Sequence, residues 1–83
     1  MNGDISFPNF LNYYDKAVTG MISEKYGYDH MTALHKFMYS KTYAMLSDKK
    51  LEMWEFGCPA IFDMWETEQI TGDPINSVYL RGD

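Results

Sequence analysis

Hydrophobic residues recur every three or four positions near the start of the chain. The positions that share this spacing are Phe7, Phe10, Leu11, Tyr14, Ala17, Val18, Met21 and Ile22. This period places them along one side of an α-helix. Ser6 is suited to cap the N-terminus, Pro8 fits the first turn, and Gly27 supplies a stop. The pattern predicts a first helix over about residues 7–26.

Two shorter helical patterns follow. Asp29 is placed to cap a second helix that runs to about residue 38. Its predicted inward face consists of Met31, Leu34, Phe37 and Met38. Ser40 is suited to cap a third, short helix that carries Thr42, Tyr43, Met45 and Leu46. The sequence leaves open whether these are two helices or one bent helix.

The segment 50–56 fits neither the helical nor the strand period, so we expect a helical turn or a short extended stretch held by Trp54. A fourth helix is predicted from Pro59 to just before Gly72. Its inward face carries Ile61, Phe62, Trp65 and Gln69, with Met64 at the edge. The apolar stretch 75–80 is then predicted to be an extended tail that docks on the body of the protein.

These elements predict one domain over residues 1–83. The fold class is all-α, a small bundle of three to four helices with an extended C-terminal tail, and the short connections favour antiparallel neighbours. A chain of 83 residues buries a thin core, which makes oligomerisation a reasonable expectation. No internal repeat or linker is present in the sequence.

Charge is unevenly distributed along the chain. The net charge is −5, and residues 48–73 account for all of it with seven acids and two lysines. Such a segment repels phosphate backbones and anionic lipid, so we expect neither nucleic acid nor a membrane surface as the main partner. With one cysteine, no apolar run long enough to span a membrane and no signal-peptide pattern, we predict a cytoplasmic protein.

Carboxylates are the first candidates for chemistry. Glu55, Asp63, Glu66 and Glu68 lie close together in the sequence, and paired carboxylates can act as acid and base or hold a divalent cation. Glu66 and Glu68 are two positions apart on a helix, however, and face different directions. A solvated acidic face or a surface that docks a partner fits this spacing better than a metal or catalytic site.

Cys58 and the two histidines offer little more. A helix N-terminus favours the thiolate form of a cysteine, but nucleophilic catalysis also needs a base, and the sequence assigns none to Cys58. His30 and His35 are about 140° apart around a helix, so they cannot bind one ion together. We therefore predict no metal and no cofactor, and favour a binding protein over an enzyme.

Tyrosines and methionines are the unusual feature of the composition, at seven residues each. A thin core cannot bury all of them, and exposed Tyr and Met are typical of recognition surfaces. The leading hypothesis is a non-enzymatic helical protein-protein interaction module, acting as a homodimer or with another protein. The predicted contact surface consists of Trp54, Glu55, Asp63 and Glu66. The alternatives are a small-molecule or metal binder or small enzyme that uses Cys58 or the acidic cluster, and an acidic antitoxin-like partner of a basic protein.

The middle of the chain also resembles a group of small bacterial helical proteins of unknown function. The similarity covers about residues 22–72. It lies in an Ala-x-x-x-Phe segment (Ala33, Phe37), a Ser-x-x-Tyr-x-x-Leu helix (Ser40, Tyr43, Leu46), the aromatic turn at 54–56 and an acidic last helix. The resemblance implies a helical fold and no particular activity. Similar small proteins are sometimes encoded beside toxin-like partners, which is compatible with an acidic binding module.

Overall fold

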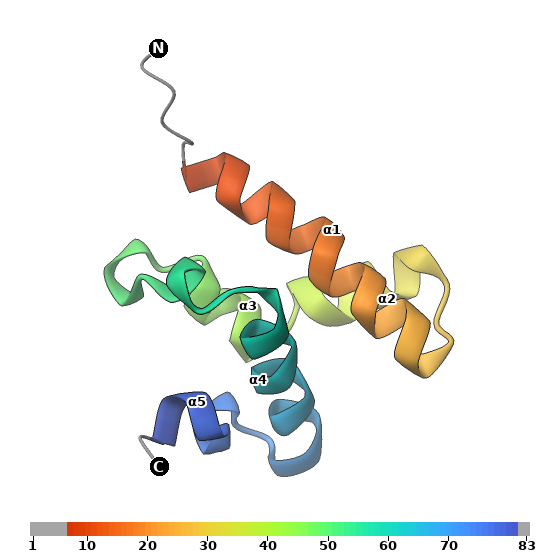
Figure 1. Cartoon of the computed structure of the whole chain (residues 1–83). Helices are drawn as coiled ribbons and strands as arrows, with labels where there is room; N and C mark the ends of the chain where they lie inside the picture. Colours follow the sequence, from red (N-terminus) through yellow and green to blue (C-terminus); the bar gives the residue numbers. More distant parts are fainter. Residues whose placement is uncertain (1–6, 82–83) are drawn as a thin grey trace.

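The structure is a computed structural model that describes residues 7–81, with side chains described for residues 11–80. Helices account for nearly all of this part of the chain, and it contains no strand. The elements in order are α1 (Phe7–Tyr26), α2 (His30–Met38), α3 (Lys41–Leu46), η1 (Lys49–Leu51), η2 (Met53–Phe56), α4 (Cys58–Thr71), η3 (Pro74–Asn76) and α5 (Val78–Arg81). The predicted all-α class is confirmed (Figure 1).

The first helices begin and end where the sequence predicts. α1 spans residues 7–26 and ends at Gly27, whose φ of 73° suits glycine; the predicted cap Ser6 lies outside the described residues. The Asp29 carboxylate accepts a hydrogen bond from the Thr32 N–H and caps α2. The Ser40 hydroxyl accepts from the Tyr43 N–H and caps α3. α2 and α3 are therefore two helices, since each has its own cap.

The segment that the sequence left open forms two consecutive 3₁₀ turns, η1 and η2. Glu52 joins them in the left-handed conformation, with φ of 51°. Gly57, with φ of 86°, then turns the chain into α4, and Gly72, also with φ of 86°, ends that helix in the left-handed conformation. These bounds agree with the predicted fourth helix to within one residue.

The C-terminal tail is helical instead of extended. The Asp73 carboxylate accepts from the Ile75 N–H and starts η3, and α5 follows directly after Ser77. Local capping thus gives this segment regular structure that its short apolar pattern did not indicate. With α5 included, the described residues form five α-helices, more than the three to four that the pattern predicts.

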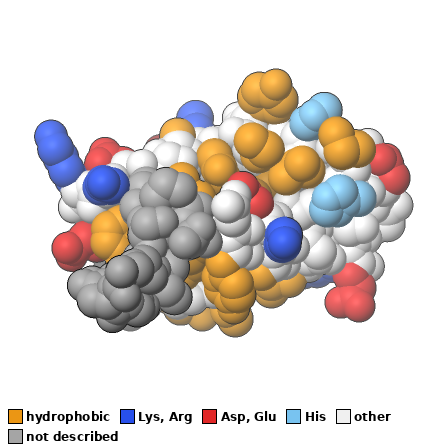
Figure 2. All heavy atoms as spheres, turned by 90° about the horizontal axis from the view of Figure 1, so that it is seen from above, with side chains coloured by type: hydrophobic (Ala, Val, Ile, Leu, Met, Phe, Trp, Pro, Cys, Tyr) orange, Lys and Arg blue, Asp and Glu red, His pale blue; other side chains and the backbone are white. Residues whose placement is uncertain are grey.

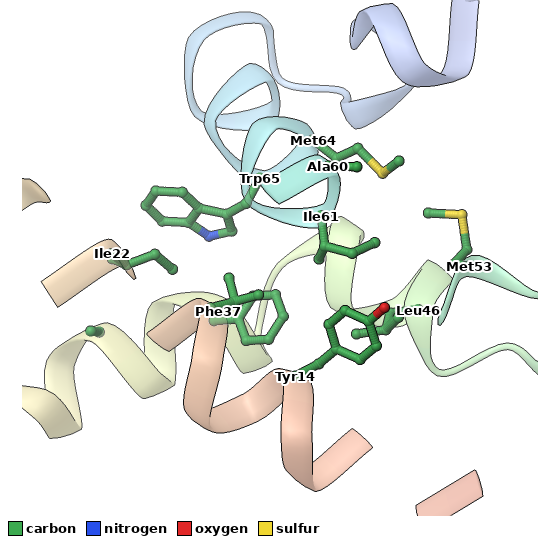
Figure 3. Close-up of a cluster of buried hydrophobic side chains, with 11 residues drawn as sticks. Tyr14, Ile22, Phe37, Leu46, Met53, Ala60, Ile61, Met64 and Trp65 are labelled. Carbon is green, nitrogen blue, oxygen red and sulfur yellow. The ribbon is translucent and has the colours of Figure 1, made fainter. Parts of the chain in front are cut away.

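The core lies where α4 meets the first three helices and η2. In Figure 3, Phe37 from α2 and Ile61 from α4 point toward one another near the centre of the cluster. The fully packed residues are Tyr14, Val18, Ile22, Ala33, Phe37, Leu46, Met53, Ala60, Ile61, Met64 and Trp65. The Trp65 indole N–H donates to the Lys36 carbonyl over 3.2 Å, which satisfies its polar atom inside this cluster.

The predicted inward face of α2 is partly wrong. Phe37 is buried as expected, but Met31 and Met38 are 54% and 43% exposed. They are seven residues, or two helical turns, apart and therefore project from the same side of α2. The apolar arc of this helix is wider than the surface that the other helices cover, so one part of it packs in the core and the other faces solvent. Gln69 on α4, also predicted to face inward, is exposed.

Candidate interaction surfaces

Trp54 and Glu55, two of the four predicted contact residues, lie in η2. This turn is tied to α1 by Tyr14, whose hydroxyl donates to the Trp54 carbonyl over 2.5 Å and accepts from the Gly57 N–H over 3.2 Å. The Trp54 side chain is half-buried, whereas Glu55 is exposed. Burial raises the pKa of Tyr14, so its hydroxyl stays protonated and able to donate.

Asp63 and Glu66, the other two predicted contact residues, form hydrogen bonds within the chain. The Asp63 carboxylate accepts from the Ser77 hydroxyl over 2.7 Å, which links α4 to the C-terminal segment. Glu66 accepts from the Lys25 ammonium and from the Tyr26 hydroxyl, each over 2.5 Å. Burial raises the pKa of Glu66, but these two bonds together outweigh it and leave the pKa below its ordinary value. Both carboxylates thus stabilise contacts between elements.

A further carboxylate, Glu68, performs a role that the sequence did not reveal. Its two oxygens accept from the Lys41 N–H over 2.8 Å, from the Thr42 N–H over 2.9 Å and from the Thr42 hydroxyl over 2.9 Å. Glu68 therefore caps the N-terminus of α3 from α4, in addition to the local cap Ser40. The partners are 26 and 27 residues apart, so no local motif could have indicated this contact.

Asp15 on α1 is the second carboxylate that meets α3, and sequence reasoning missed it as well. Burial raises its pKa, and a hydrogen-bonding contact with the Tyr43 side chain opposes that shift. For Tyr43, burial and the contact with Asp15 raise the pKa to about 12. Asp15 and Tyr43 thus form a half-buried polar contact between α1 and α3. The pattern of hydrophobic positions indicates only apolar contacts between helices.

Cys58 is half-buried at the first position of α4. A hydrogen bond with Cys58 raises the pKa of the Tyr13 hydroxyl, so this neighbour is a neutral phenol at pH 7. His30 and His35 are exposed on α2, and the His35 ring lies 5.9 Å from that of Tyr39. Among the described residues, no group of three or more His, Cys, Asp or Glu side chains is arranged to hold a metal ion.

The outer face of α2 carries large apolar side chains that the fold leaves exposed. We call Met31, Met38 and Tyr39 the methionine face; Tyr39, the C-cap residue that follows α2, is 86% exposed. Leu34 lies half-buried between this face and the core. Figure 2 shows hydrophobic side chains gathered next to the two histidines on one side of the molecule.

Large apolar side chains also reach solvent near the C-terminus. Ile70 in the last turn of α4 is 83% exposed, and Ile75, Val78 and Tyr79 are each about half exposed. Single exposed apolar residues are ordinary on protein surfaces. The methionine face differs because Met31 and Met38 project from the same side of one helix and Tyr39 follows directly at its C-terminal end.

Comparison of the chain with protein families, with curated proteins and with solved structures finds no match. Within the described residues, no helix combines the length and apolar character that crossing a membrane requires. The arguments for function therefore come from the surfaces above.

Proposed function

We propose that this chain is a non-enzymatic protein-interaction module and that the methionine face of α2 is a docking surface. The observation that carries the proposal is that α2 has apolar residues on two sides, of which folding buries only one. Ala33 and Phe37 are completely buried, while Met31, Met38 and Tyr39 face solvent.

The energetics support a role in binding. Each Å² of apolar surface removed from water contributes roughly 25 cal/mol, so a partner that covers this face gains from surface that folding leaves exposed. Methionine side chains are flexible and polarisable, and they adapt to the shape of a partner. Tyrosine adds a large contact area at low entropic cost. This surface is therefore better suited to protein contact than to holding a small polar substrate.

The surroundings of Cys58 fit a structural role for this residue better than a catalytic one. A thiol nucleophile needs a neighbouring group that accepts its proton. The hydrogen-bonding neighbour Tyr13 is a phenol with a raised pKa, which is already protonated at neutral pH.

Trp54 and the exposed Glu55 remain a prediction for a second contact area. A cytoplasmic location and the resemblance to small bacterial helical proteins also remain predictions.

Site-specific photo-cross-linking in the source cells tests the proposal directly. A photoreactive phenylalanine analogue is placed at Met31 or Met38, and at the exposed polar positions Glu24 or Lys50 as matched controls. We expect adducts of discrete mass from positions 31 and 38 and none from the controls. Light scattering across a concentration series then identifies whether the partner is a second copy.

A charged variant provides the complementary measurement. Met31→Glu combined with Met38→Glu should abolish the adduct formed by an analogue at Tyr39, while Ile70→Glu, on the end of α4, should leave it unchanged. Circular dichroism confirms that both variants are folded. A monomeric protein that forms no adduct from positions 31, 38 or 39 would overturn the proposal.

A further inference from the structure

Two buried oxygens on α1 have no hydrogen-bond partner in the described structure. They are Oδ1 of Asp15 and Oγ1 of Thr19, and both are shielded from solvent. Thr19 is completely buried, and Asp15 is half-buried beside the Tyr43 side chain. Buried polar atoms are nearly always hydrogen-bonded, so two such oxygens on one helix raise the question of what satisfies them.

The spacing of the two residues places their side chains on the same side of α1. Asp15 and Thr19 are four apart in α1, and side chains at this spacing are neighbours on one helix face. A helical threonine usually satisfies its hydroxyl by bonding to the carbonyl four residues earlier. Thr71 does this with the Thr67 carbonyl over 2.9 Å, whereas Thr19 makes no such bond. The Thr19 hydroxyl is thus available to a group other than its own helix.

We propose that Asp15 and Thr19 bind one internal water molecule at the contact between α1 and α3. The water donates one hydrogen to Asp15 Oδ1 and exchanges a second hydrogen bond with Thr19 Oγ1. It thereby adds a polar contact to a carboxylate that also meets the Tyr43 side chain on α3. Buried waters characteristically make two to four such bonds to groups that lack other partners.

A bound metal ion fits this site less well than water. Cations such as Ca²⁺ require six to eight oxygen ligands, and Mg²⁺ requires near-octahedral coordination. The two side chains supply only two unpartnered oxygens, and no third acid or histidine joins them among the described residues. The two unpartnered oxygens of Asp15 and Thr19 match the small number of hydrogen bonds that one water molecule makes.

A double-mutant cycle tests the proposal. If a water links the two side chains, Thr19→Val removes one of its partners and weakens the native state. Asp15→Ala, which removes the other partner of the water, and Thr19→Val should then be coupled by roughly threefold or more in the unfolding equilibrium constant. The control pair Asp15→Ala and Thr71→Val should be additive, because Thr71 is exposed and satisfied by its own helix.

A crystal structure of the wild-type protein gives the second readout. We expect one density peak within about 3.2 Å of both oxygens, absent in the Thr19→Val protein. A dry site would instead make Thr19→Val stabilising and the cycle additive, with no density between the oxygens. A stability that changes when sodium replaces choline at equal ionic strength would show a cation in place of water. Either result would overturn the proposal.

Discussion

Two carboxylates from different helices meet the short helix α3, and their surroundings are opposite. Glu68 from α4 reaches the N-terminus of α3, where both of its oxygens accept hydrogen bonds, two of them from backbone N–H groups. Asp15 from α1 reaches the side chain of Tyr43, and one of its oxygens has no partner within the described chain. One helix of six residues is thus held by one fully satisfied carboxylate and one partly satisfied carboxylate.

The contrast shows that placement decides what a buried carboxylate does for stability. The first N–H groups of a helix have no partner within the helix, and the helix dipole favours negative charge there. At this position Glu68 replaces the water that it loses with equivalent donors. Asp15 gains fewer donors from the protein than Glu68 does, so its burial opposes ionisation and raises its pKa.

The largest effect is expected from removal of Glu68. Glu68→Ala leaves the Lys41 and Thr42 N–H groups without these acceptors, and lost caps and unmet buried donors each reduce stability. We expect the free energy of unfolding to fall by about 2 kcal/mol. Urea denaturation followed by circular dichroism measures this change.

Glu24→Ala is the matched control, because Glu24 is an exposed glutamate on α1. It should change stability by less than about 0.5 kcal/mol. Glu68→Gln, which keeps one oxygen acceptor, should lie between the two. If Glu68→Ala and Glu24→Ala were equally mild, the cap from α4 would contribute nothing and the contrast with Asp15 would disappear.

Asp15→Asn should act in the opposite direction. The amide has nearly the same shape as the carboxylate but carries no charge, so it avoids the free energy needed to bury an ionised group. We expect the free energy of unfolding at pH 7 to rise by up to about 1 kcal/mol. A loss of stability in the same denaturation experiment would mean that the charge on Asp15 is favourable where it stands.

The pH dependence of stability gives a second test of the contribution of Asp15. Because the pKa of Asp15 is raised on folding, the native state binds more protons than the unfolded state between the ordinary and the raised pKa. The contribution of Asp15 to stability is therefore greatest below the ordinary pKa and is lost as the pH rises through the raised value. Asp15→Asn should remove this decline from a curve of unfolding free energy between pH 3 and 8. An identical curve for the two proteins would contradict the assignment.

The helices of this fold follow from local signals, which explains why most of them could be predicted. Asp29 and Ser40 each cap a helix through a bond to a residue three positions later. Gly57 and Gly72 occupy positive φ, where glycine is favoured, at the two ends of α4. Signals of this kind lie within a few residues of the structure that they specify.

The contacts between helices depend on partners that are distant in the sequence, and these could not be predicted. Glu68, Glu66 and Asp63 all appear as a solvated acidic face when the fourth helix is considered alone. In the folded chain they bond to α3, to α1 and to Ser77 respectively. The methionine face was missed for a related reason. The pattern of α2 gives one wide apolar arc but not how much of it the neighbouring helices cover.

The smallest effect is expected at Glu66, where the comparison extends to the surface. Its bond to Lys25 joins a side chain that is 18% exposed to one that is 56% exposed, so solvent and salt screen most of the attraction. Glu66→Gln keeps an acceptor for Tyr26 and should reduce stability less than Glu68→Gln. Because the pKa of Glu66 is lowered, its contribution is present above the ordinary pKa and is lost as the pH falls.

At about 1 M salt the Debye length shrinks to about 3 Å, and the difference between Glu66→Gln and the wild type should vanish. The effect of Glu68→Ala should persist there, since hydrogen bonds to helix N–H groups depend on geometry more than on long-range charge. If the stability difference between Glu66→Gln and the wild type persisted at high salt, Glu66 would resemble Glu68. Its contribution would then come from its hydrogen bonds and not from long-range charge.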